Sequence, residues 1–161
     1  PILDTPGYLP GVDQEREGLI HRGAKFAFAG VEATVPKVTL VVRKAYGGAY
    51  AVMGSKNLNG DINLAWPTAQ IAVMGSAAAV VMLQGKQLAA IEDPAQREAM
   101  KKMFMDFYDA EMTSPYVAAE RGYIDAVIEP ADTRLHLRKA LAQLKDKERL
   151  DMPRKHPVMP L

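Results

Sequence analysis

Gly47 and Gly48 form the stretch of this chain whose residue types and spacing best suit chemistry. The apolar run 38–42 before them predicts a buried strand, and the segment from Ala49 to Met53 predicts the first turn of a helix. A strand that passes through adjacent glycines into a helix leaves backbone N–H groups without acceptors at the helix start. Such groups can hold an anion, and glycine lets a ligand approach them closely. The stretch indicates a main-chain oxyanion site, with an ordinary tight turn as the alternative.

The side chains offer little other chemistry. There is no Gly-Lys-Ser/Thr ending and no spaced G-x-G-x-x-G, which excludes both common nucleotide-binding loops. There is no cysteine, which excludes thiolate catalysis and thiolate metal sites. The histidines lack the spacing of a metal pair and the serines lack the G-x-S-x-G setting of a nucleophile: His21, His136, His156, Ser55, Ser76 and Ser114. No metal is therefore expected.

Asp4 follows a predicted strand stub at Ile2 and Leu3, a position where a carboxylate could be catalytic. More simply, it hydrogen-bonds the Thr-Pro-Gly turn that follows it. Ser114 is more simply a helix cap than a nucleophile. With these side chains assigned to structural roles, main-chain chemistry at Gly48 is the remaining candidate.

The elements expected to position the glycines alternate between strand and helix, which predicts parallel β–α units and an α/β fold. Further strands are predicted at 62–67, 70–74 and 123–128. Helices are predicted at 13–30, 76–83, 94–112, 115–122 and 132–145, with Asp13, Asp93, Ser114 and Asp132 as caps. The small-residue stripe of the first helix (Leu19, Ile20, Gly23, Ala24 and Ala27) predicts close packing on the sheet. The helical spacing of Met100, Met103, Phe104, Met105, Phe107 and Tyr108 predicts core.

Length and composition limit the classes of protein. A chain of 161 residues fits one domain, and a net charge of +1 argues against a general nucleic-acid surface. No apolar run reaches the roughly 18 residues of a membrane span, and no signal peptide is visible. These features together favour a cytoplasmic protein. Because the chain begins with Pro1 inside a predicted strand, we expect it to be the C-terminal piece of a longer protein.

Several long segments resemble the carboxyltransferase β subunits of biotin-dependent acyl-CoA carboxylases, most closely the acetyl-/propionyl-CoA type. They are DTPGYLPG at 4–11, RGAK at 22–25, ATVPK at 33–37, RKAYGGAY at 43–50, NLAWPTAQIAVMG at 63–75 and RGYIDAVIEP at 121–130. The resemblance implies a ClpP/crotonase-like fold of ββα units wound into a superhelix. It also implies that residues 1–146 are most of a C-terminal carboxyltransferase domain, followed by an irregular tail at 147–161.

The same resemblance implies a function and its residues. Such subunits transfer a carboxyl group from carboxybiotin to the α-carbon of an acyl-CoA, and biotin is carried by a separate protein or domain. The main-chain N–H groups of Gly48 and Ala49 are implied to hold the ureido oxygen of biotin. Tyr50 and Ala51 are implied to bind substrate, and Gly7 and Tyr8 to form a loop on the biotin side.

The implied partners are an acyl-CoA, the biotin carboxyl carrier or biotin carboxylase α subunit, and further copies of the chain. Family members form dimers of opposed subunits within a hexamer. The N-terminal domain, with the CoA site and a second oxyanion hole, is absent here, so we expect the isolated chain to be inactive. The position of Ala51 is often Asp or a branched aliphatic residue in the family. The smaller Ala51 predicts a roomier pocket and an acyl chain longer than propionyl.

Two other classes of function stay open at this stage. The chain could be a non-catalytic module that docks a biotinyl carrier or another subunit. It could also be another enzyme of crotonase fold, such as a decarboxylase relative, although the length of the matching motifs disfavours this.

Overall fold

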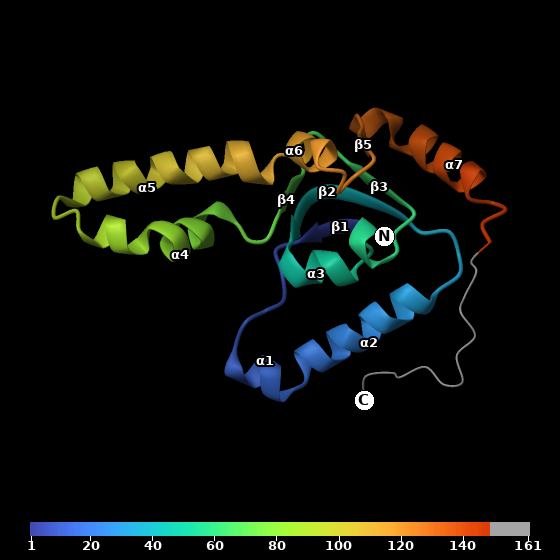
Figure 1. Ribbon diagram of the computed structural model, residues 1–161, viewed down its shortest axis with the longest axis horizontal. Helices are drawn as coiled ribbons and strands as arrows, with labels where there is room; N and C mark the ends of the chain where they lie inside the picture. Colours follow the sequence, from blue (N-terminus) through green and yellow to red (C-terminus); the bar gives the residue numbers. More distant parts are fainter. Residues whose placement is uncertain (149–161) are drawn as a thin grey trace.

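A parallel sheet forms the centre of residues 1–148, the part of the chain that the computed structural model describes (Figure 1). Its strands are β1 (Ile2–Thr5), β2 (Val38–Tyr46), β3 (Ile62–Ala65), β4 (Gln70–Ala72) and β5 (Ala126–Val127). Each pairing among them is parallel, which confirms the predicted α/β class. Several strand boundaries differ from the prediction. Strand β2 runs four residues further, β3 and β4 each end two residues earlier, and β5 is only two residues long.

Strand β2 is the longest strand of the described sheet and carries most of its pairing. It pairs with β1 in the register Ile2↔Leu40, and its first half pairs with β3. Its last three residues pair with β4, so that Tyr46 lies opposite Ala72. Since parallel strands end at the same edge of a sheet, the residues after Tyr46 and after Ala72 come together there.

Both faces of the sheet are covered, which explains why β2 is continuously apolar at its start. On one face a buried cluster joins the sheet to α3 (Gly47–Val52) and α6 (Pro115–Glu120): Leu3, Val41, Ala45, Ala65, Ala69, Ile71, Ala118 and Ile124, with Tyr50 and Met53 packed against it. On the other face Leu40, Leu64 and Ile128 contact Leu137 of α7 (Thr133–Gln143). The core thus holds α3, and the glycines at its start, against the sheet.

The predicted helix at 13–30 is wrong in two respects. It is divided at Gly18, whose φ of 81° is left-handed, into α1 (Val12–Arg16) and α2 (Leu19–Glu32). Gly11 occupies the capping position, so Asp13 lies inside the first turn instead of capping it. Helix α2 packs on α3 and on the short helix η1 (Lys56–Leu58), not on the sheet, and none of its residues is fully buried.

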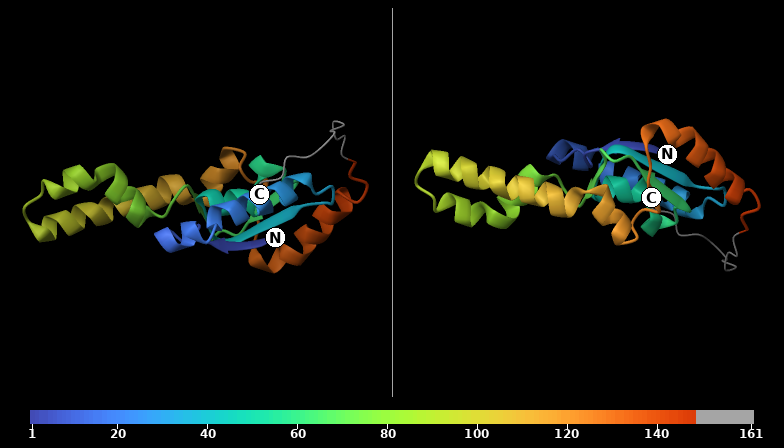
Figure 2. Two further views of the ribbon diagram at one scale, coloured as in Figure 1. Left: turned by 90° about the horizontal axis from the view of Figure 1, so that it is seen from below. Right: turned by 90° about the horizontal axis from the view of Figure 1, so that it is seen from above.

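Helices α4 (Ser76–Ala89) and α5 (Pro94–Tyr108) form a hairpin that projects from the sheet (Figures 1 and 2). The prediction that the methionines and aromatic residues of α5 are core is therefore wrong, since no residue of α5 is fully buried. Met103 is 53% exposed and Phe107 is 62% exposed. Helix α4 packs against α5 and leaves part of this apolar set half-buried, whereas Met103 and Phe107 stay exposed: the half-buried residues are Met100, Phe104, Met105 and Tyr108. A π-helical turn, η2 (Asp109–Thr113), follows α5.

Two of the predicted caps are confirmed. The side chains of Asp93 and Ser114 accept hydrogen bonds from the amides of Ala95 and Tyr116, and a proline follows each cap. Asp132 instead ends the short helix η3 (Pro130–Asp132), and its side chain makes no capping hydrogen bond. Of the predicted tail, residues 149–161 lie outside the described residues. Within residues 1–148, none of the helices is both long and apolar enough to cross a membrane.

A largely buried ion pair joins Lys147 to Asp61 at the start of β3. The two side chains are 12% and 16% exposed, and Lys147 Nζ lies 2.8 Å from Asp61 Oδ2. The amide of Lys37 also donates to Asp61 Oδ2, at 2.7 Å. Burial opposes the charge of Asp61, but these hydrogen bonds outweigh it and hold the pKa of the carboxyl below its ordinary value.

This lowered pKa predicts a pH-dependent contribution to stability. The contribution is complete above the unfolded pKa of about 3.9 and is lost as the pH falls through the lower folded value. Asp61→Asn should therefore reduce the free energy of unfolding by about 2 kcal/mol at pH 7 and by much less near pH 2. Urea unfolding at both pH values measures this. Asp146→Asn, on an exposed ion pair, is the control, and a deficit equal at both pH values contradicts the assignment.

Candidate active site

The junction between β2 and α3 is built as its sequence predicted, although the helix begins at Gly47, two residues earlier than expected. Gly47 has a left-handed φ of 58°, and a Cβ there would lie 2.9 Å from the carbonyl oxygen of Val73. Only glycine satisfies both conditions without strain. The residue lets the chain turn directly from the strand into the helix beside the end of β4.

Gly48 and Ala49 occupy the second and third positions of α3, where the helical pattern provides no acceptor for the backbone N–H. Gly48 is exposed and Ala49 is buried. An anion in front of this turn could accept from both N–H groups.

Tyr8 comes from the loop after β1 and lies against this turn. A Cβ at Gly48 would meet Tyr8 Cε2 at 3.5 Å, which is ordinary contact. The other edge of the ring reaches α2, where a Cβ at Gly23 would lie only 2.4 Å from Tyr8 Oη. Gly23, which was predicted to pack on the sheet, instead makes room for the Tyr8 ring. Gly7, before it, has a φ of 126° that only glycine adopts readily.

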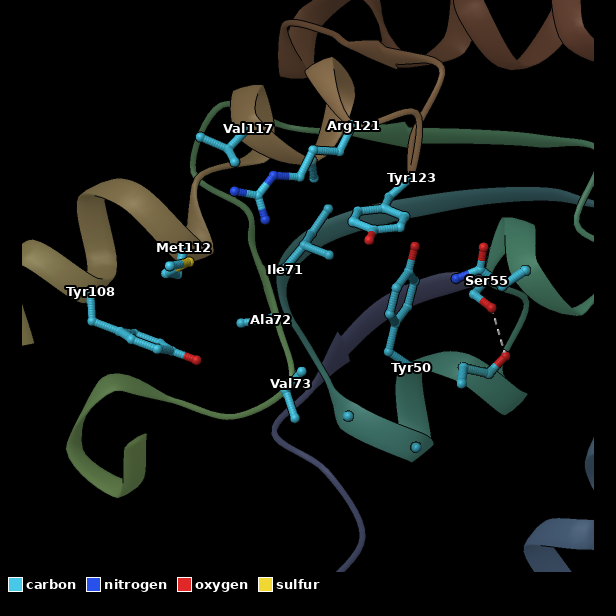
Figure 3. Close-up of a pocket in the computed structure, with 15 residues that line it drawn as sticks. Tyr50, Ser55, Ile71, Ala72, Val73, Tyr108, Met112, Val117, Arg121 and Tyr123 are labelled. Atoms are coloured by element: carbon cyan, nitrogen blue, oxygen red, sulfur yellow. Dashed lines mark hydrogen bonds between the residues drawn. The ribbon is translucent and has the colours of Figure 1, made fainter. Parts of the chain in front are cut away.

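A cavity of about 530 Å³ opens beside the start of α3 (Figure 3). Tyr50 and Ala51 line this α3 cavity, as does the amide-bearing turn at Gly47 and Gly48. The rest of the lining comes from β4, from η2 and from the α6–β5 region: Ile71, Ala72, Val73, Tyr108, Met112, Val117, Ala118, Arg121 and Tyr123, with Ser55 and Asn57 from the segment after α3. Of the predicted residues, Gly48, Tyr50 and Ala51 therefore line one apolar space, whereas Ala49 is buried and is not part of its lining.

The polar groups of the α3 cavity are few. Tyr108 donates its hydroxyl to the carbonyl oxygen of Met74 at 3.2 Å, and Ser55 Oγ donates to the carbonyl of Ala51 at 3.0 Å. The hydroxyl of Tyr50 is buried and has no partner within residues 1–148, and burial raises its pKa. It is thus a neutral donor at physiological pH.

Arg121 and Tyr123 are cavity residues that sequence reasoning used only as part of a matching motif. They are more than 70 residues from Gly48, so no local pattern links them to it. The one available signal was Gly122 between them, whose left-handed φ of 76° ends α6 and turns the chain back to the sheet.

Asp4 does not bind the turn that follows it, so that interpretation is wrong. Its carboxylate accepts from Arg43 Nη2 at 2.7 Å and from the amide of Lys44 at 3.2 Å. The hydrogen bond from Arg43 is the main reason that the pKa of Asp4 is lowered. Asp4 therefore fastens β1 to β2 and is absent from the lining of the α3 cavity.

The described residues include no cluster of three or more histidines and carboxylates that could hold a metal ion. His21 lies on α2 and His136 on α7, and neither lines the α3 cavity; His156 is outside the described residues. Across residues 1–148, the chemistry available at this site is hydrogen bonding from main-chain N–H groups and from a small number of cavity side chains.

Comparison with known proteins gives one consistent family. The family model described as the carboxyl transferase domain matches residues 1–159. The chain is 51% identical to the biotin-dependent long chain acyl-coenzyme A carboxylase beta4 subunit of Mycobacterium tuberculosis and 53% identical to the propionyl-CoA carboxylase beta chain of Saccharopolyspora erythraea. It is 50% identical to the methylmalonyl-CoA decarboxylase subunit alpha of Propionigenium modestum. Each match covers 99% of this chain and 30% of the relative.

A solved structure agrees with these relatives. The transcarboxylase 12S crystal structure with methylmalonyl-CoA and methylmalonic acid bound superposes with a TM-score of 0.92 at 44% identity, over 99% of this chain and 30% of that one. That transcarboxylase is described as a hexamer assembly. The chain thus spans about a third of the length of the proteins it matches. The length of the shared motifs was expected to disfavour a decarboxylase relative. The match to a decarboxylase subunit at 50% identity shows that such motifs occur in decarboxylases too.

Proposed function

We propose that this chain, which belongs to the carboxyl transferase domain family, supplies the biotin-side half of a carboxyltransferase active site. Its fold is the crotonase fold of the carboxyltransferases that it matches. The proposed reaction transfers a carboxyl group from carboxybiotin to the α-carbon of an acyl-CoA. The observation that carries the proposal is the turn at Gly47 and Gly48, which presents unpaired N–H groups beside an apolar cavity.

The residues of the turn fit a biotin ureido group. The exposed Gly48 has no side chain to block approach, and the Tyr8 ring beside it offers an apolar wall for a flat ring system. Two adjacent N–H groups suit a single oxygen acceptor. Biotin, when bound on its carrier, supplies the carboxyl group and takes up the α-proton of the acyl-CoA.

The chain's own contribution is hydrogen bonding and position. Gly48 and Ala49 donate their N–H groups to the ureido oxygen and stabilise the negative charge that develops there. Gly47, which has a left-handed φ and no Cβ to clash with the carbonyl oxygen of Val73, sets the direction of both donors. Because the donors belong to a helix held by the core, they need no rearrangement during the reaction, which is the condition for effective electrostatic stabilisation. No general base from the chain is required, because the cofactor performs that step.

The α3 cavity is the proposed site for the acyl chain. Ile71, Val73 and Val117 give it apolar walls, and Ala51 leaves space where a larger side chain would fill it. Tyr50 stands beside Ala51 and is the other proposed substrate contact. We propose an acyl chain longer than propionyl.

A carboxylation assay tests the proposed function. The complete carboxylase, with the full-length subunit and its biotinylated partner, should transfer labelled bicarbonate to an acyl-CoA in the presence of ATP. Residues 1–161 alone with free biotin should give no product above background. Appreciable malonyl-type product from residues 1–161 contradicts the half-site proposal. Absence of product from the complete enzyme contradicts the function, and carrier binding without turnover would favour a docking module.

Association with other chains is part of the proposal. A hexamer is described for transcarboxylase 12S. In this chain, the projecting hairpin carries several exposed apolar residues: Val81, Met82, Leu83, Met103 and Phe107. Apolar area of this kind commonly marks protein–protein contact. We propose that the full-length subunit forms dimers of opposed subunits within a hexamer, binds a biotin carboxyl carrier or biotin carboxylase subunit, and acts in the cytoplasm.

A second candidate function is the reverse transfer, from a carboxylated acyl-CoA to biotin. The 50% identity to a methylmalonyl-CoA decarboxylase subunit supports this candidate, because that identity is close to those with the carboxylases. The same N–H donors serve both directions, because the ureido oxygen carries charge in each. Following label from a carboxylated acyl-CoA into biotin without ATP distinguishes this candidate from the first.

A further inference from the structure

Arg121 brings a positive charge to the α3 cavity that nothing in the proposed chemistry so far uses. It follows the last turn of α6, and its side chain extends toward Ile71 and Val117 across the cavity (Figure 3). Within residues 1–148 its guanidinium has no hydrogen-bond or ion-pair partner. Asp125, the nearest carboxylate after it in the sequence, is already bound to Lys56 and to the amide of Asn63. Arg121 is exposed, so water solvates its charge in the free protein, and a ligand that enters the cavity can take the place of that water.

A second donor without a partner lies in the same cavity. The hydroxyl of Tyr50 is buried and makes no hydrogen bond to any described residue. A buried hydroxyl loses its bond to water on folding, so an acceptor from a ligand would restore a favourable interaction. Arg121 comes from the end of α6 and Tyr50 from α3, and both meet the cavity from different sides (Figure 3).

The chemistry of these donors selects an oxygen anion. A guanidinium is a planar fork that matches the two oxygens of a carboxylate. Ile71 is buried, whereas Val73 and Met112 are exposed, so the apolar lining strengthens a charge-assisted bond once a bound ligand excludes water. An uncharged alkyl chain would displace water from the guanidinium and leave the Tyr50 hydroxyl unpaired.

We propose that Arg121, assisted by the hydroxyl of Tyr50, binds a carboxylate of the acyl ligand in the α3 cavity. The inference rests on the proposed function, in which substrate and product differ by one carboxylate. Arg121 would then be a specificity residue that distinguishes a carboxylated acyl group from an uncarboxylated one. Its carboxylate has two sources: the group that is transferred, at the α-carbon, or an acid group at the far end of the acyl chain.

Matched ligands separate binding of the carboxylate from binding of CoA. Affinities of the full-length subunit are measured by calorimetry for methylmalonyl-CoA and propionyl-CoA, and for succinyl-CoA and butyryl-CoA. Arg121→Leu should weaken the binding of the carboxylated CoA ester of one pair about tenfold, because one charge-assisted hydrogen bond is lost. The affinity for the uncarboxylated ester of that pair should change less than about twofold. A loss confined to the first pair identifies the transferred carboxyl group, and a loss confined to the second identifies a terminal acid.

Variants keep the test independent of folding and of turnover. Arg121→Lys retains the charge without the fork and should weaken the same ligand by a smaller factor. Tyr50→Phe removes only the hydroxyl and should weaken it about threefold. Arg138→Leu, on the exposed surface of α7, should have no effect. Equal losses for both members of each pair, or no loss, overturn the inference. Because binding needs no biotin, failure of carboxylation would contradict the proposed function separately.

Discussion

Replacing Gly48 by proline should lower the turnover of the complete carboxylase about 10²–10³-fold, the usual effect of losing one oxyanion donor. Proline has no N–H, and its φ is fixed near the helical value. Because Gly48 is in the first turn of α3, where the N–H has no acceptor in the helix, the substitution removes no helical hydrogen bond. The loss should therefore fall on catalysis and on affinity for the biotinylated carrier, with a small change in thermal stability.

Gly48→Ala is the matched control for this experiment. It keeps the N–H group, and its Cβ would meet Tyr8 at 3.5 Å, an ordinary contact. We therefore expect the alanine variant to lose much less activity than the proline variant, because it keeps the donor and adds only a methyl group beside the path of approach. Steady-state kinetics with acyl-CoA and with carboxylated carrier measure both variants. Equal activity of Gly48→Pro and wild type, with the fold verified by circular dichroism, would show that this N–H does not contact the reacting group.

Ala51→Asp should shift the preference of the complete enzyme from long acyl chains to short ones by about 10–200-fold in kcat/KM, the range that small changes in an apolar pocket produce. Ala51 lines the α3 cavity beside Tyr50, and a carboxylate there would occupy the space proposed for the acyl chain. It would also have to be desolvated against apolar walls, which long alkyl chains would make more costly.

Ala51→Ser is the control, since it adds a small neutral group at the same position. It should change the preference far less than Ala51→Asp. The comparison requires rates for acetyl-, propionyl- and longer acyl-CoA substrates with each variant. If the wild-type enzyme carboxylates acetyl- and propionyl-CoA as well as or better than long chains, the idea of a roomier pocket is wrong.

The comparisons place the chain in its family, whereas the roles of individual residues stay predictions that these variants test. Identities near 50% extend to carboxylases and to a decarboxylase alike. Because the identities are so similar, they do not distinguish the two directions of carboxyl transfer for this chain. The measurements on Gly48 and Arg121 address the shared chemistry and are informative for either direction.

Much of the local structure was predictable because it depends on neighbours in the chain. The parallel strands follow from apolar runs, and the caps at Asp93 and Ser114 follow from a residue type before a proline. The strand, two glycines and a helix at the β2–α3 junction identified the proposed oxyanion site without any tertiary information. Hydrogen bonds within four residues and side-chain periodicity determine all of these features.

The tertiary structure decided which distant residues share the site. The parallel register of β1 and β2 brings the loop with Tyr8 to Gly48, and the return of the chain after Gly122 brings Arg121 to the cavity beside Tyr50. It also pairs Asp4 with Arg43 and leaves Met103 and Phe107 of α5 exposed, against the predictions for Asp4 and for α5. The sequence alone determined that an amide-bearing turn exists at Gly48. What surrounds that turn depends on contacts between segments more than 20 residues apart, and local hydrogen bonding and periodicity contain no information about such contacts.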